Sequence, residues 1–119
     1  MSVKICTVNQ LSEPLNAANF LKMARGDLAG LRQLANDFFN DTRHQMTGWQ
    51  ALIADGNFSQ LRDELHRCKG GASLFGLERI VGLISSFESP GVLESRGFDV
   101  AQFEIELTAA EMAVLSMTD

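Results

Sequence analysis

The spacing of apolar residues, in a chain with few helix-breaking residues, most constrains the fold. Only two prolines occur among the 119 residues, Pro14 and Pro90, and between them apolar side chains recur at intervals of three and four. This interval matches one turn of an α-helix, and a proline inside such a stretch would break or kink the helix. We therefore predict an all-α fold.

Turn and capping signals divide this periodic stretch into helices. Asn16, Asn57 and Asp99 are suitable N-caps, and Arg25-Gly26 is a suitable helix end. Short connections make consecutive helices antiparallel. We expect an antiparallel four-helix bundle with a short N-terminal lid helix, its five helices at about residues 16–25, 27–54, 57–75, 77–89 and 99–117.

Length and charge limit the classes of protein that this chain can belong to. Its 119 residues suit a single domain, which we place at residues 1–119. Fifteen acidic and ten basic residues give a formal net charge of −5, which disfavours binding to nucleic acid. We also expect a monomer, because no apolar seam is left over once the bundle is assembled.

The apolar runs are far shorter than the roughly 20 residues that span a bilayer, so no membrane segment is expected. Residues 1–10 lack the apolar stretch of a signal peptide, and we expect a cytoplasmic protein. Cys6 and Cys68 lie far apart without a histidine cluster, which argues against a disulfide framework or a zinc site. Both are expected to be free thiols.

One face of the helix at 57–75 carries candidate chemistry. Its apolar seam runs along one side, and a second stripe holds Arg62, His66, Lys69, Gly70 and Ser73. An exposed imidazole is a nucleophile near neutral pH. Lys69 lies within reach of a phosphate on that histidine, and Gly70 leaves the space one turn beyond it open. Gly71, next to it, allows a neighbouring helix to come close.

The run from His66 to Gly76 reads His-Arg-Cys-Lys-Gly-Gly-Ala-Ser-Leu-Phe-Gly. It resembles the signature of histidine phosphotransfer (HPt) domains, in which a histidine is followed after two residues by Lys-Gly, small residues, and an apolar residue before glycine. Cys68 and Gly71 depart mildly from this pattern. The preceding helix also resembles its counterpart in the family, with Leu31, Leu34 and Phe38 in the expected places.

The resemblance implies a function in a two-component phosphorelay. His66 would accept a phosphoryl group from a receiver-domain aspartyl phosphate and pass it to another receiver, with Lys69 stabilising its charge and Gly70 providing clearance. The implied partners are response-regulator receiver domains and a sensor or hybrid histidine kinase. The chain is expected to need no cofactor or metal of its own, since Mg²⁺ belongs to the receiver. No kinase ATP-binding site is recognisable, so the chain is expected to be a phosphoryl carrier rather than an enzyme.

A docking patch for the receiver is predicted around His66. It combines Arg62, Ser73 and Leu74 with Phe39 of the preceding helix. Phe39 and Leu74 are expected to be partly exposed, because the apolar seams do not account for them. Exposed apolar side chains beside a reactive group can orient a transient partner.

Two other classes of function stay open. A helical adapter could bind a response regulator without phosphotransfer, although it would have no need of a histidine beside a lysine and a glycine. A phosphatase would need a positioned acid, amide or metal, and Asp63 and Glu64 flank His66 without evident geometry. The other histidine, His44, has no partner residues in the sequence and is expected to be an ordinary surface residue.

Overall fold

The computed structural model describes residues 13–117, and the regular structure in this range is entirely helical. The predicted all-α class is confirmed for these residues. None of the helices is long and apolar enough to cross a membrane. The expectations for Cys6 and for residues 1–10 lie outside the described range. The helices are α2 (Ala17–Ala24), α3 (Leu28–Met46), α4 (Trp49–Ala54), α5 (Phe58–Leu74), α6 (Glu78–Ser85), α7 (Val92–Arg96) and α8 (Val100–Leu115).

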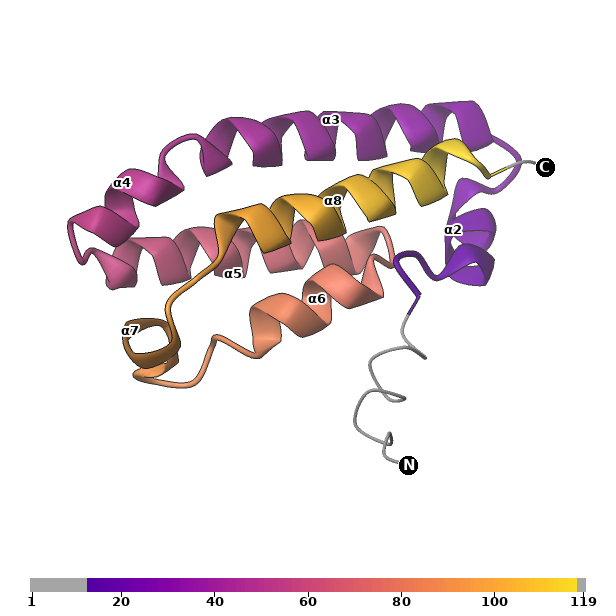
Figure 1. The fold of residues 1–119 in the computed structure, drawn as a ribbon. Coiled ribbons are helices and arrows are strands. Elements are labelled where there is room, and N and C mark those ends of the chain that lie inside the picture. Colours follow the sequence, from indigo (N-terminus) through magenta and orange to yellow (C-terminus); the bar gives the residue numbers. More distant parts are fainter. Residues whose placement is uncertain (1–12, 118–119) are drawn as a thin grey trace.

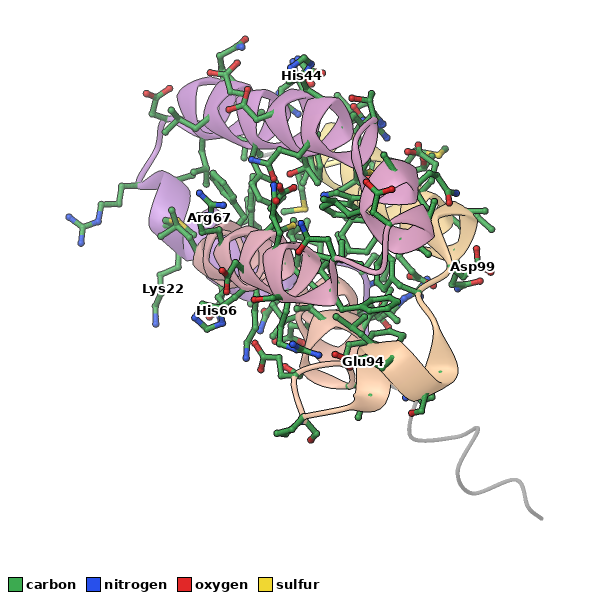
Figure 2. All side chains as sticks on the ribbon, turned by 90° about the vertical axis from the view of Figure 1, so that its left-hand side faces the viewer. Lys22, His44, His66, Arg67, Glu94 and Asp99 are labelled. Carbon is green, nitrogen blue, oxygen red and sulfur yellow. The ribbon has the colours of Figure 1, made fainter. Side chains whose placement is uncertain are left out.

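Helices α3, α5, α6 and α8 lie side by side, with α2 at one end and α4 and α7 at the other (Figure 1). Viewed along their length, they surround one core, with α5 and α8 at opposite corners (Figure 2). Accordingly, α8 packs on α3 and α6, and α5 packs on α6, α4 and α3. The outward faces of α5 and α8 therefore point to different sides of the molecule.

Side-chain caps explain where four helices begin. In α2, α3, α5 and α8, an Asn or Asp oxygen accepts a hydrogen bond from the backbone N–H three residues later, at 3.0 to 3.3 Å. These bonds satisfy N–H groups that have no partner inside the helix. The caps predicted at Asn16, Asn57 and Asp99 are confirmed, and Asp27 is a fourth.

The single helix predicted over 27–54 is wrong, because α3 ends at Met46 and α4 begins at Trp49. The Thr47 hydroxyl donates to the backbone oxygen of His44 at 2.6 Å, and Gly48 has a low helix propensity. Trp49, the first residue of α4, is fully buried in the core. Its indole N–H donates to a carboxylate oxygen of Glu64 on α5 at 2.7 Å, and this hydrogen bond links α4 to α5.

The helix predicted over 77–89 is too long. Helix α6 ends at Ser85, and the Ser86 hydroxyl donates to the backbone oxygen of Leu83 at 2.6 Å. A turn with Gly91 at φ +83° then leads into α7, a short helix with no counterpart among the predicted ones. Ending the helix early directs Glu88 towards α5, where it joins the candidate site.

The prediction that Phe39 is partly exposed is also wrong, because only 1 % of its surface is accessible. The buried positions of α3 include Ala35, Phe39 and Thr42, whereas Phe38 is half-buried. Intervals of three and four after Ala35 allow either phenylalanine to face inward. The two rings meet edge to face at 5.7 Å, and the contact of Phe38 with α5 selects Phe39 for the core.

Candidate functional site

The buried seam of α5 determines the direction of His66. Leu61, Leu65, Cys68 and Ala72 face the core, and each residue advances the helix by about 100°. The side chain of His66 is 73 % exposed. Figure 2 shows it projecting outward from α5, away from the side that carries His44.

Glu88 contacts both His66 and Lys69, and sequence reasoning missed it. One of its carboxylate oxygens lies 3.0 Å from Nδ1 of His66, and the other accepts a hydrogen bond from Nζ of Lys69 at 2.7 Å. Glu88 is 22 residues from His66 in the chain and follows the end of α6. The Ser-Pro-Gly turn after it indicates an end of a helix, but no sequence signal places it beside α5.

The carboxylate of Glu88 determines which imidazole nitrogen is free. Hydrogen bonds from Lys69, and then from His66, hold the pKa of Glu88 below its ordinary value, so it is ionised at neutral pH. An ionised carboxylate can only accept hydrogen bonds. Nδ1 of His66 is therefore protonated and donates its hydrogen to Glu88. In the neutral imidazole, the lone pair then lies on Nε2. The arrangement therefore leaves the lone pair of Nε2 without a partner in Glu88.

Lys69 supplies a positive charge within one turn of His66. Its side chain is 27 % exposed, and its ammonium group pairs with Glu88. A flexible lysine can move between two anionic partners that lie close together. Because Glu88 holds both side chains, the ammonium group of Lys69 is kept close to the imidazole of His66.

The two adjacent glycines of α5 have different surroundings. A Cβ atom added at Gly70 would meet nothing within 4 Å, so this position is open on the outer face. A Cβ atom at Gly71 would lie 2.6 Å from Cε1 and 2.8 Å from Cδ1 of Phe38. Gly71 therefore lets the ring of Phe38 pack directly on the backbone of α5, as its position in the sequence predicts.

We expect alanine at these two positions to change stability in opposite directions. Gly70→Ala should raise the free energy of unfolding by up to about 1 kcal/mol, because alanine is the better helix former. Gly71→Ala should lower it by about 1–3 kcal/mol, because the methyl group would displace a ring already packed against Phe75. Urea unfolding followed by the fluorescence of Trp49, the single tryptophan, measures both. Destabilisation by Gly70→Ala would show that this face is covered.

The predicted docking residues are only partly brought together. Ser73 and Leu74 are exposed beyond His66, and Leu74 is 63 % accessible. Arg62 is engaged by Glu94 of α7 at 2.9 Å and is therefore not a free cation. Phe39 lies in the core and drops out of the patch.

An exposed leucine of α3 and a groove beside Leu74 are available in place of Phe39. Leu34, 59 % exposed, lies one turn before Phe38 on α3, on the side where Phe38 packs against α5. Beside Leu74, an open groove separates α2 from the end of α5, and it is lined by Asn19, Lys22, Met23, Arg25, Ser73, Leu74 and Gly76.

Cys68 faces the core two residues after His66. Burial raises the pKa of its thiol to about 11. It is a free thiol, and at neutral pH it stays protonated and weakly nucleophilic. Cys68 therefore offers no reactive thiol beside the exposed imidazole of His66.

Comparison with known families agrees with this geometry. The family model of the Hpt domain matches residues 17–115, which is the span from the start of α2 to the end of α8. No curated protein and no solved structure gives a significant match. The match covers most of the 119 residues and includes every helix described above. The chain therefore belongs to the Hpt domain family.

Proposed function

We propose that this protein accepts a phosphoryl group on Nε2 of His66 from a receiver-domain aspartyl phosphate and passes it to another receiver domain. In the first step an N–P bond forms, the aspartyl O–P bond breaks, and the receiver regains its carboxylate. The second step reverses this chemistry on a different aspartate. The observation that carries the proposal is the exposed imidazole, held through Nδ1 by Glu88 with Lys69 on the same carboxylate.

Membership of the family supports this proposal. Hpt domains are phosphocarrier modules of phosphorelays rather than kinases. We further propose that α3 with α4, α5, α6 and α8 form the antiparallel four-helix bundle expected for the family, that α2 is its lid, and that residues 1–119 are one domain. Within this proposal the protein is cytoplasmic.

The transfer needs little from the carrier itself. Phosphoryl transfer depends mainly on in-line positioning and on compensation of charge on the transferred oxygens. We assign the Mg²⁺ to the receiver, and to this chain the nucleophile His66 and the cation Lys69. All the residues of the site come from one chain, so a single copy is sufficient for the reaction.

The receiver is proposed to dock beside His66 on a surface made of Leu74, Leu34 and the groove between α2 and α5. The apolar side chains provide contact area, and Lys22 and Arg25 in the groove suit an acidic partner surface. A relay needs weak, repeated binding, which interfaces below about 1,200 Å² provide. This docking surface replaces the predicted one that included Phe39.

Transfer from labelled receivers tests the proposal. Receiver domains phosphorylated with ³²P-acetyl phosphate are mixed with the protein, and the label on the protein is tested for stability in acid and alkali. We expect label that is lost in acid and kept in alkali, as phosphohistidine requires. A protein that binds receivers without becoming labelled would instead be an adapter.

Lys69→Ala is expected to slow transfer or to shorten the lifetime of the phosphohistidine by about tenfold or more. Hydrogen bonds to charged groups contribute about 1.5–3 kcal/mol, and Lys69 makes them with the phosphoryl oxygens in this proposal. Quenched-flow transfer and decay of the label measure the two effects. The thermal midpoint should barely change, because the charged end of the side chain pairs with Glu88 at a partly exposed position.

Arg67 provides the matched control, since it is an exposed cation on the same helix. Arg67→Ala should leave transfer unchanged. Glu88→Gln removes the carboxylate that holds both Lys69 and His66, so Lys69→Ala is repeated in that background. If Lys69 acts only through Glu88, adding Lys69→Ala to Glu88→Gln will cause no further loss of transfer, and the proposed contact with the phosphoryl group is wrong.

A further inference from the structure

Helix α8 carries two apolar rows on opposite faces. The inner row, which includes Phe103, Leu107, Ala110 and Val114, is buried in the core. The outer row is spaced four, three, four and three residues apart and consists of Ala101, Ile105, Thr108, Met112 and Leu115. Ile105, Met112 and Leu115 are 60 %, 65 % and 65 % exposed. An apolar seam is therefore left over after the bundle is assembled.

The outer row contains no charged residue. The acidic residues of α8 lie at its flanks and are ion-paired with neighbouring helices: Glu104 and Glu111 with Arg43 of α3, and Glu106 with Arg79 of α6. The hydroxyl of Thr108 is also engaged, by Arg43 and Glu104. A solvent-facing helix surface normally carries free polar and charged groups, whereas a helix that is apolar all round is normally buried.

We propose that the outer face of α8 binds the same face of a second copy of this chain, with the two α8 helices antiparallel about a two-fold axis. Alternating intervals of four and three are the pattern of helices that pack at a small crossing angle. A two-fold interface must be self-complementary. In the antiparallel arrangement, Ile105 of one copy contacts Leu115 of the second copy, and Thr108 contacts Met112 of the second copy. The two-fold axis repeats both contacts with the copies exchanged.

Charge favours a second copy at this face over other faces. The chain has a formal net charge of −5, so free acidic groups on most surfaces repel a second copy. Beside the α8 row, each acidic side chain is already held by an arginine of its own copy. Burying a charged surface is costly mainly because an unpaired charge must lose its water. Two copies can approach at this face without that cost.

The dimer is expected to be weak and to leave the phosphorylation site open. A 16-residue helix is about 24 Å long, and contact along it buries less than the roughly 800 Å² per partner of a stable complex. We expect a dissociation constant between about 10 μM and 1 mM. Because α8 lies at the corner opposite α5, His66 of both copies stays accessible (Figure 2).

Sedimentation velocity from about 1 μM to 1 mM tests the dimer. The wild type should shift reversibly from monomer to dimer, and Ile105→Glu should raise the dissociation constant at least tenfold with unchanged circular dichroism. Leu34→Glu is the matched control, because Leu34 is 59 % exposed on α3, and it should dimerise as the wild type does. A wild type that stays monomeric to 1 mM, as it would if a different protein covers this face, overturns the proposal. So does a dimer unaffected by Ile105→Glu.

Disulfide trapping tests the antiparallel orientation. Cys6→Ser leaves the buried Cys68 as the parent thiol, and Ala109→Cys or Gln102→Cys is added to it. The two copies of residue 109 lie near the proposed axis, whereas the copies of residue 102 lie about 20 Å apart or more. Oxidation should therefore link Ala109→Cys and not Gln102→Cys. Equal linking at both positions would indicate parallel helices and overturn the proposed geometry.

Discussion

Replacing His66 by Gln is expected to abolish phosphoryl acceptance from a labelled receiver. The glutamine amide nitrogen is delocalised and offers no basic lone pair, whereas Nε2 of His66 does. No neighbour can substitute, since Glu88 and Lys69 hold each other and Cys68 is buried with a raised pKa. Label incorporated per mole of protein measures the effect, and it should fall to background.

The matched control is His44→Gln, which removes the other histidine of the chain. His44 is exposed on α3, on a different side of the molecule from His66 (Figure 2), and its replacement should leave labelling complete. Both variants should keep the circular dichroism of the wild type, because both side chains face solvent. Full labelling of the His66 variant, or loss of label in the His44 variant, would refute the assignment of the phosphoacceptor.

Replacing Phe39 by Ala is expected to lower the free energy of unfolding by about 3–5 kcal/mol. The ring is 1 % exposed, packs against Phe38, and lies in the core between α3 and its neighbours. Its removal leaves a cavity that the surrounding helices cannot fill completely. Urea unfolding followed by circular dichroism gives the change.

Leu74→Ala is the contrasting variant, because Leu74 is an exposed apolar residue near His66. It should change stability by less than about 0.5 kcal/mol but weaken receiver binding and slow transfer. Phe39→Ala should have the opposite profile, with normal receiver binding wherever the variant is folded. A receiver-binding defect in folded Phe39→Ala, without loss of stability, would restore Phe39 to the docking surface.

The candidate site divides into a part that could be predicted from sequence and a part that could not. His66, Lys69 and Gly70 lie on one helix, where an advance of 100° per residue determines which side chains share a face. The contact of Gly71 with α3 could be predicted because two glycines within a helix need a reason. Glu88 could not, since its contact with His66 depends on how the segment after α6 folds back over α5.

The outer face of α8 illustrates the same limit. The inner row of α8 is sufficient to pack this helix into the core. From the sequence we therefore expect no second apolar row to remain on its outer face. The ion pairs of Arg43 and Arg79 with the flanking acidic residues join different helices, and no local pattern indicates them. With those charges paired, the outer apolar row of α8 is left exposed without a free charge in it.

The sequence by itself determined the helical class, the N-caps and the face of α5 that carries His66, because each depends on hydrogen bonds or periodicity within a few residues. Only the tertiary structure decided which of Phe38 and Phe39 enters the core, since intervals of three and four fit both and the contact of Phe38 with Gly71 settles the choice. It also decided that the chain breaks at Thr47-Gly48, that the indole of Trp49 pairs with Glu64, and that Glu88 joins His66 and Lys69. These contacts link segments far apart in the chain, and their energies depend on how the helices pack rather than on the residues next to them.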